Sequence, residues 1–224
     1  MIVFSETKSQ EAVAPDSFEA QRDAPEFSLA RALRNRNFWL IGSIWFCYSF
    51  CLFTIMTHIV PYAIDSGISP MQAASILSVL GFASMPSRIL MGIVSDKFGR
   101  KLAGLIGAVL MVAAMVLLIQ SSSLWMLYIF AVVFGAAYGG LSPSTTAIVG
   151  DTFGVRHIGT IIGTLEIGWT LGAAIGPALA GYIFDTTGKY FLAFLVGIVA
   201  SLIIVVLFLL IKTPTAKIKE LSSH

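Results

Sequence analysis

The stretch MGIVSDKFGRK, residues 91–101, ends a long apolar run with an aspartate, a glycine and several basic residues. Glycine adopts backbone conformations that other residues avoid, so Gly99 suits a tight turn. Asp96, Arg100 and Lys101 can form charge-assisted hydrogen bonds between helix ends, and a helix terminus offers its dipole to Asp96. The spacing predicts a short charged loop between two helices, which can latch one conformation and release it in another.

Six long apolar runs surround this loop, and each is at or near the roughly 20 residues that a helix needs to cross the hydrocarbon. Of the 224 residues, 57% are hydrophobic and 12% are charged, whereas soluble domains carry about a quarter charged residues. Helices are the only open-ended structures that satisfy their backbone in lipid. The sequence therefore predicts an all-α polytopic membrane protein with six transmembrane helices, near 38–62, 71–95, 102–120, 124–149, 158–184 and 190–211.

The apolar runs divide the chain into a polar segment at 1–37, a six-helix domain at 38–211 and a tail at 212–224. The composition of 1–37, acidic and interrupted by prolines, is typical of a flexible, solvated segment. Cytoplasmic loops of membrane proteins collect lysine and arginine. We therefore expect a multi-pass protein of the cell membrane with both termini cytoplasmic. This orientation puts twelve of the fourteen basic residues inside: Lys8, Arg22, Arg31, Arg34, Arg36, Lys97, Arg100, Lys101, Arg156, Lys212, Lys217 and Lys219.

The loop at 91–101 follows the pattern G-x-x-x-D-x-x-G-R-K, formed by Gly92, Asp96, Gly99, Arg100 and Lys101. It resembles the signature loop of the major facilitator superfamily, which joins the second and third helix of a half and helps to hold the cytoplasmic side closed. An ordinary basic loop is the alternative. Three stretches look like the C-terminal half of monocarboxylate-porter and oxalate/formate-antiporter relatives: RALRNRNFWL (31–40), THIVPYAIDSGIS (57–69) and GYIFDTTGKYFLAF (181–194).

The resemblance covers about residues 28–212 and implies half of a twelve-helix fold, arranged as two inverted three-helix repeats. Residues 1–37 then correspond to the end of the family's central cytoplasmic loop. In this interpretation Met1 shortens the family's usual length, and the N-terminal half is missing. The chain would work with a separately encoded N-terminal half or as a homo-oligomer.

Glycines in the fifth run repeat every fourth position at Gly168, Gly172 and Gly176, followed by Pro177. Small residues at this spacing let another helix approach closely, and proline can bend a helix locally. With Gly163, the spacing G-x8-G-x3-G-P also resembles that of antiporter members of the superfamily. This row is either a packing surface only or a gating surface as well.

The fourth run also contains glycines, Gly135, Gly139 and Gly140, ahead of Pro143 and several hydroxyl residues. Two interpretations stay open for this segment. It lines a cavity, or its serine and threonine hydroxyls satisfy the helix's own backbone.

Ionisable groups within the apolar runs are costly in lipid and are candidates for function. Arg88 lies on the second run, and an arginine can grip a carboxylate with two parallel bonds. The monocarboxylate and oxalate relatives carry an arginine on this helix that is thought to bind the substrate carboxylate, and Arg88 matches its placement. A structural ion pair or snorkelling to the interface is the alternative. Proton-coupled porters have an aspartate one turn earlier, where this chain has Ser84.

Two further ionisable residues are candidate substrate-binding groups. Glu166 lies near mid-depth on the fifth run, where a buried carboxylate can take up and release a proton. It carries a proton, pairs with Arg88 or faces a wet gap. His58, near the outer end of the first run, titrates near neutrality and can relay protons; the alternative is a hydrogen-bonded anchor.

These features favour secondary active transport of a small organic anion, a monocarboxylate or dicarboxylate, by alternating access. The alternative is a non-transporting truncated half or a regulatory subunit of a transporter. The expected partners are membrane lipid, the anion and a proton. The net charge of +2 gives no basic field for nucleic acid. We expect no enzyme activity, metal or cofactor, because no nucleophile triad, nucleotide-binding loop or metal-ligand pattern occurs in the sequence.

Overall fold

The computed structural model describes residues 29–121, 123–154 and 157–211, and these residues are helical apart from short connections. Six helices in the described part are long and apolar enough to cross a membrane, which confirms the predicted fold class. A short helix, α2 (Leu29–Leu33), precedes them. The six are α3 (Arg36–Asp65), α4 (Pro70–Phe98), α5 (Arg100–Gln120), α6 (Leu124–Phe153), α7 (Ile158–Thr187) and α8 (Phe191–Leu210).

Most helices extend a few residues beyond their apolar runs, because local signals set their ends. The Asn35 side chain accepts a hydrogen bond from the Asn37 backbone N–H at 2.9 Å and so caps the start of α3, as asparagine commonly does. Pro70 is the first residue of α4, a position where its missing N–H costs nothing. Gly99, with φ of +97°, ends α4 and forms the turn to α5. The turn therefore lies at Gly99, as the sequence predicts.

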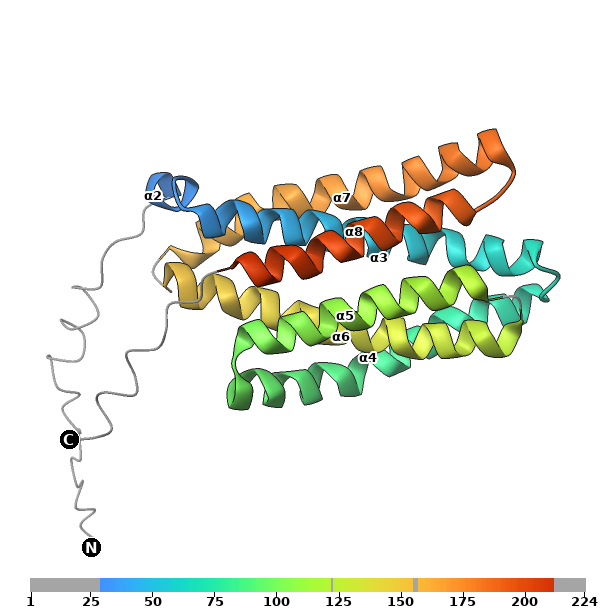
Figure 1. Ribbon diagram of the computed structural model, residues 1–224, viewed down its shortest axis with the longest axis horizontal. Coiled ribbons are helices and arrows are strands. Elements are labelled where there is room, and N and C mark those ends of the chain that lie inside the picture. The colour runs from blue at the N-terminus through green and yellow to red at the C-terminus, as the bar shows by residue number, and fades with distance from the viewer. Residues whose placement is uncertain (1–28, 122, 155–156, 212–224) are drawn as a thin grey trace, which may run out of the picture.

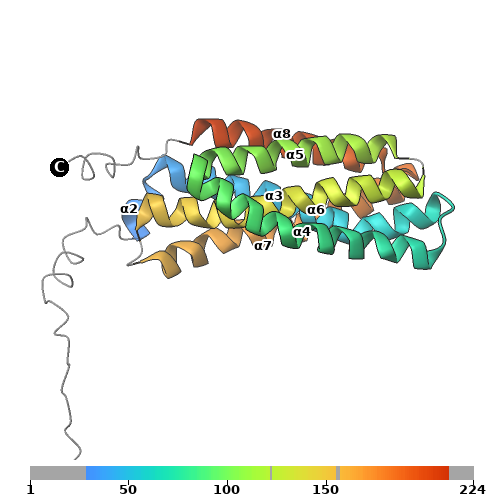
Figure 2. The same cartoon turned by 90° about the horizontal axis from the view of Figure 1, so that it is seen from below.

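The helices form three layers. In Figure 2, α3 and α6 lie in the middle, α5 and α8 on one side, and α4 and α7 on the other. Figure 1 shows α4 and α7 at opposite edges of the bundle. In chain order the helices form two groups of three, α3–α5 and α6–α8. The middle helix of the first group, α4, packs mainly against α6, and the middle helix of the second group, α7, packs mainly against α3. The middle helix of each group thus rests on the first helix of the other, an exchange that two related three-helix repeats would produce.

Two helices are covered least by the rest of the bundle. In the most apolar stretch of each helix, 17% of the residues are buried in α7 and 28% in α4, against 67% in α3. Their exposed side chains include Phe82 and Ile89 on α4 and Ile167 and Leu171 on α7. Each of these helices therefore keeps one long face outside the six-helix bundle.

The predicted glycine row of α7 lies against α3. A Cβ atom at Gly172 would overlap the backbone oxygen of Phe46, and one at Gly176 would lie 2.6 Å from that of Phe50. At Gly168 the distance to the Gly42 oxygen would be 3.1 Å. The two backbones approach so closely because these positions have no side chain.

The glycines of α6 have the same role against α4. A Cβ atom at Gly135 or Gly139 would overlap a backbone oxygen of α4, from Leu80 or Ser84 respectively, and one at Gly140 would lie 2.7 Å from the Met91 side chain. The hydroxyls that follow donate within α6, and Ser144 donates to the Gly140 oxygen at 3.0 Å. These glycines therefore pack against a helix, and the hydroxyls that follow satisfy their own backbone. The contacts favour the second interpretation of this segment, and a role in lining a cavity stays a prediction.

The bundle has two ends, which we call the Arg100 end and the Tyr190 end. The Arg100 end holds the starts of α3, α5 and α7 and the ends of α4, α6 and α8. The Tyr190 end holds the opposite ends and the connection from α7 to α8. The described chain starts and finishes at the Arg100 end (Figure 1).

Candidate functional site

A row of polar-tipped side chains crosses the bundle from α4 to α7. The Arg88 guanidinium on α4 donates from Nη2 to the Tyr138 hydroxyl of α6 at 3.0 Å, and its Cζ lies 5.3 Å from the Tyr138 ring centre. Tyr48 of α3 donates from its hydroxyl to the Tyr138 backbone oxygen at 2.8 Å. The Tyr48 ring meets Trp169 of α7 edge-on, at 5.2 Å between centroids. We call Arg88, Tyr138, Tyr48 and Trp169 the aromatic row.

The packing of the helices holds this row in place. Ser87, the residue before Arg88, is buried and donates to the Ala136 backbone oxygen of α6 at 2.5 Å. On the other side, Ser49 of α3 donates to the Trp169 backbone oxygen at 2.7 Å. Each end of the row is therefore tied across a close helix contact, which limits how far Arg88 and Trp169 can move relative to the central helices.

The Arg88 side chain is exposed, and within the described part of the chain it forms no ion pair with a carboxylate. It lies ten residues before Phe98, so at 1.5 Å per residue it is about 15 Å inside that end of α4. Tyr138 is a neutral partner that orients the guanidinium and leaves its charge uncompensated.

Glu166 does not meet Arg88. Among the residues that the structure describes, its carboxylate forms no ion pair, and the two side chains stand on helices at opposite edges of the bundle (Figure 1). The structure thus gives no support to the Arg88–Glu166 pair. Glu166 is exposed and lies one helical turn before Trp169, next to the α7 end of the aromatic row.

His58 lies toward the Tyr190 end, away from Arg88. Its Nε2 is 3.0 Å from the Pro177 backbone oxygen of α7, and its Nδ1 is 3.4 Å from the Tyr190 hydroxyl. With both ring nitrogens engaged, His58 ties α3 to α7 and to the α7–α8 connection. This geometry favours the anchor interpretation.

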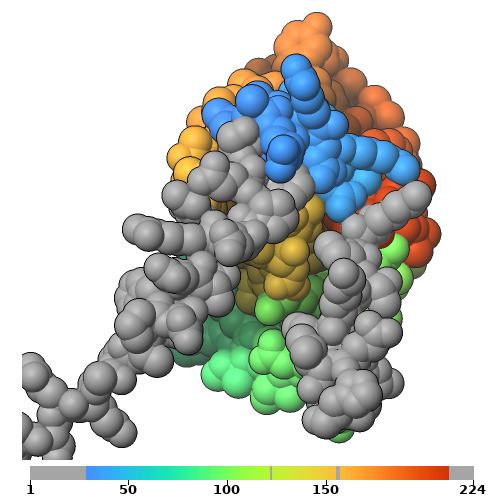
Figure 3. Space-filling model, turned by 90° about the vertical axis from the view of Figure 1, so that its left-hand side faces the viewer, coloured from blue at the N-terminus to red at the C-terminus, as the bar shows by residue number. Residues whose placement is uncertain are grey.

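The charges of the 91–101 loop have separate partners at the Arg100 end. Arg100 forms an ion pair with Asp151 of α6, with Nε 2.5 Å from Oδ2. Lys101 donates from Nζ to the backbone oxygens of Leu209 and Ile211, at 2.9 and 2.7 Å, and so caps the last turn of α8. In Figure 3 the yellow end of α6 lies between the blue start of α3 and the green α4–α5 turn. The two basic residues thus join α5 to α6 and α8.

Two further members of the loop pattern, Asp96 and Gly92, face outward. Asp96 is exposed at the end of α4 and forms no ion pair within the described ranges. Gly92 stands one turn earlier, with open space where a Cβ atom would lie. Within the described residues, Asp96 and Lys97 are thus the charges of the loop that are exposed and form no ion pair.

The sequence interpretation missed Tyr48, Tyr138, Trp169 and Asp151. The first three are polar-tipped aromatic residues deep inside apolar runs, whereas such residues commonly gather at the membrane interface. Their unusual position inside the apolar runs was the signal by which the sequence could have identified them. Asp151 had a weaker signal, an acid in one predicted cytoplasmic loop that faces a basic loop.

A sequence model of the Major Facilitator Superfamily matches residues 46–223. Over 144 residues the chain is 29% identical to monocarboxylate transporter 12 of Xenopus laevis, covering 62% of this chain and 31% of that protein. It is 32% identical over 136 residues to multidrug resistance protein MdtG of Proteus mirabilis, with coverages of 59% and 34%. The chain thus spans about a third of the length of these curated relatives.

Solved structures show the same fold at low sequence identity. Peptide transporter POT in complex with sulfate has a TM-score of 0.72 and 19% identity, over 94% of this chain and 46% of that one. The transporter FucP in its outward conformation has a TM-score of 0.67 and 18% identity, over 84% and 46%. In both, the described bundle corresponds to less than half of the larger chain.

Proposed function

The chain belongs to the Major Facilitator Superfamily, and from that premise we propose that it provides six helices of a secondary transporter that moves a small organic anion by alternating access. The observation that carries this proposal is the environment of Arg88. Its guanidinium is exposed about 15 Å inside the end of α4; among the residues that the structure describes, a phenol holds it and no carboxylate does. A permanent positive charge at that depth is costly unless it faces a cavity or a partner.

In this proposal Arg88 binds the carboxylate of the anion with two parallel N–H bonds. Tyr138 orients the guanidinium, and Tyr48 and Trp169 form the wall beside it. Glu166, near the far end of the row, takes up and releases the coupled proton, a role that Ser84 cannot fill. The name of the Xenopus laevis relative, a monocarboxylate transporter, is in line with a carboxylate as cargo.

The loop at 91–101 acts as the gate. Arg100 and Lys101 keep the ends of α5, α6 and α8 together, and Asp96 meets a partner when that end of the molecule closes. We place this end on the cytoplasmic side of the cell membrane, because the basic residues collect there. Transporters of this type rock one repeat or bundle against another around a fixed site. The second bundle is either a separately encoded half or another copy of this chain.

Uptake of labelled monocarboxylates and dicarboxylates into proteoliposomes that contain the purified chain tests the role of Arg88. We expect saturable uptake that falls at least about tenfold in Arg88→Ala, since a hydrogen bond to a charged group contributes about 1.5–3 kcal/mol. Arg88→Lys should recover part of it, because lysine keeps the charge and loses the fork. Tyr138→Phe should reduce uptake by a smaller factor.

Arg34→Ala is the matched control, because it removes one exposed arginine that lies outside both the row and the loop at 91–101. Its uptake should equal that of the unmodified chain. Equal uptake by Arg88→Ala and the unmodified chain would contradict the anion role. If the folded, unmodified chain shows no uptake, co-reconstitution with candidate N-terminal halves distinguishes a half that needs its partner from a non-transporting regulatory subunit.

A further inference from the structure

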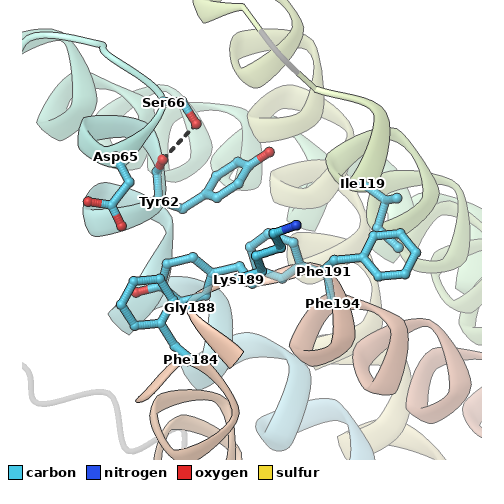
Figure 4. Close-up of a pocket in the computed structure, with 10 residues that line it drawn as sticks. Tyr62, Asp65, Ser66, Ile119, Phe184, Gly188, Lys189, Phe191 and Phe194 are labelled. Carbon is cyan, nitrogen blue, oxygen red and sulfur yellow. Dashed lines mark hydrogen bonds between the residues drawn. The ribbon is translucent and has the colours of Figure 1, made fainter. Parts of the chain in front are cut away.

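A second site lies at the Tyr190 end, on a different part of the bundle from the aromatic row. A cavity of about 400 Å³ opens there between the last turn of α3, the end of α5 and the connection from α7 into α8 (Figure 4). Its lining combines two opposite charges, Asp65 and Lys189, with a wall of aromatic and apolar side chains. Neither charge has a role in the proposed anion transport.

The two charged side chains of the cavity do not form an ion pair with each other. Asp65 and Lys189 are both exposed, and within the described residues they form no ion pair. Figure 4 shows the Asp65 carboxylate and the Lys189 ammonium apart, each beside the open cavity. A ligand that carries both an ammonium and an acid group can therefore satisfy both.

The aromatic part of the wall is rigid before any ligand enters. The Tyr190 ring stacks on Phe184 and Phe194, with centroids 4.3 and 5.7 Å apart. Tyr62 meets Phe194 edge-on at 5.0 Å, and its hydroxyl donates to the Ser121 backbone oxygen at 2.8 Å. Such a wall loses little conformational freedom on binding, which favours affinity.

The potential at the charged side is shaped by more than one acid. Tyr190 lies between α7 and α8, outside the spanning helices. Burial raises the pKa of its phenol, and the nearby Asp65 and Asp185 carboxylates raise it further. Tyr190 therefore stays neutral, and the two carboxylates make the potential at its hydroxyl more negative. An ammonium group is favoured at this side of the cavity.

The other side of the cavity is apolar and continues along the outside of the bundle. Ile119 of α5 and Phe191 of α8 line it. Val116, Leu192 and Leu195 on the same two helices are exposed apolar residues. Since α3 has 30 residues, it is about 45 Å long. That matches a bilayer with its headgroup layers, so the cavity lies at headgroup depth.

We propose that this cavity binds an amphipathic zwitterion, with a primary ammonium at Asp65, an acid group at Lys189 and an apolar portion along Ile119 and Phe191. The ethanolamine phospholipid of a bilayer has this chemistry, with a phosphate as the acid group. A free amino acid with an apolar side chain shares its ionic part. In either case the bound zwitterion bridges α3 to the α7–α8 connection.

Native mass spectrometry of the detergent-solubilised chain, titrated with phospholipids of identical acyl chains, tests the proposal. We expect phosphatidylethanolamine to bind about tenfold more tightly than phosphatidylcholine, because the trimethylated headgroup has no N–H to donate to Asp65. Asp65→Asn should remove this preference. Lys189→Gln should weaken the binding of both lipids alike, because both carry the phosphate. Asp96→Asn and Lys97→Gln, matched charge changes at the Arg100 end, should leave binding unchanged.

A second measurement separates lipid from solute. Thermal unfolding of the same variants with free leucine shows whether a soluble zwitterion occupies the cavity. A stabilisation by leucine that Asp65→Asn abolishes, without any preference among the lipids, supports the zwitterion site with a solute as its ligand. The proposal is overturned if the unmodified chain neither distinguishes the two lipids nor responds to leucine, or if Asp65→Asn and Lys189→Gln change neither response.

Discussion

The α3–α7 contact and the α4–α6 contact are built from the same parts in different places. In each, a glycine of one helix lies against a backbone oxygen of the other: Gly172 against Phe46, and Gly139 against Ser84. In each, a serine of the opposite helix donates across the contact, Ser49 to α7 and Ser87 to α6. The glycine belongs to the middle helix in the first contact and to the first helix in the second.

This difference determines what the two open helices present. Because α7 contributes the glycines to its contact, its buried residues from Gly172 to Ala180 are small, and its exposed face carries Glu166. In the α4–α6 contact the glycines come from α6, and the buried face of α4 carries serines. Arg88 follows one of them, Ser87, at the edge of the contact. Both contacts therefore set the geometry of the aromatic row, one at each end.

The largest effect is expected when either glycine gains a methyl group. In Gly139→Ala and Gly172→Ala the new Cβ meets a backbone oxygen, which cannot move aside as a side chain would. Overpacking of this kind costs about 1–3 kcal/mol, and the aromatic row should separate at that end. Thermal unfolding of the purified variants in one detergent measures the loss.

Gly92→Ala on α4 and Gly163→Ala on α7 are the matched controls, because an added Cβ at either position meets no atom within 4 Å. Each should be neutral or more stable by up to about 1 kcal/mol, the helix propensity that alanine gains over glycine. If Gly139→Ala proves as stable as Gly92→Ala, the α4–α6 contact is looser than described and the comparison fails.

A smaller effect is expected for the serines. Ser49→Ala and Ser87→Ala each remove one hydrogen bond between helices, which contributes about 1 kcal/mol. Ser84→Ala is the control, because Ser84 is equally buried and donates to Gly81 of its own helix. Unfolding free energies of the three variants test whether bonds between helices matter more than bonds within one. Equal losses at Ser84 and Ser87 would contradict that idea.

The smallest effect on stability is expected for the charges on the open faces. Glu166→Gln should change the free energy of unfolding by less than about 0.5 kcal/mol, as exposed substitutions commonly do. If Glu166 carries the coupled proton, the same variant should take up the anion without responding to an imposed pH gradient. Uptake that still follows the gradient in Glu166→Gln would assign the proton to another group.

The sequence by itself determined the number of helices, their approximate limits and the family. Apolar runs of membrane-spanning length leave few other structures possible in lipid. The loop at 91–101 was equally readable, because its turn depends on one local property, the backbone freedom of Gly99. The glycine row of α7 was readable as a packing surface from its spacing alone. These are features that a segment carries without reference to the rest of the chain.

Only the tertiary structure decided which helix each face meets. It placed Tyr138 on Arg88, Asp151 on Arg100 and the α6 glycines on α4, and it separated Arg88 from Glu166. The physical reason lies in the solvent. In water, the buried face of a helix is more apolar than its exposed face, so periodicity reveals it. In lipid the outward side chains are as apolar as the core, and the rotation and neighbours of each helix depend on contacts between distant segments.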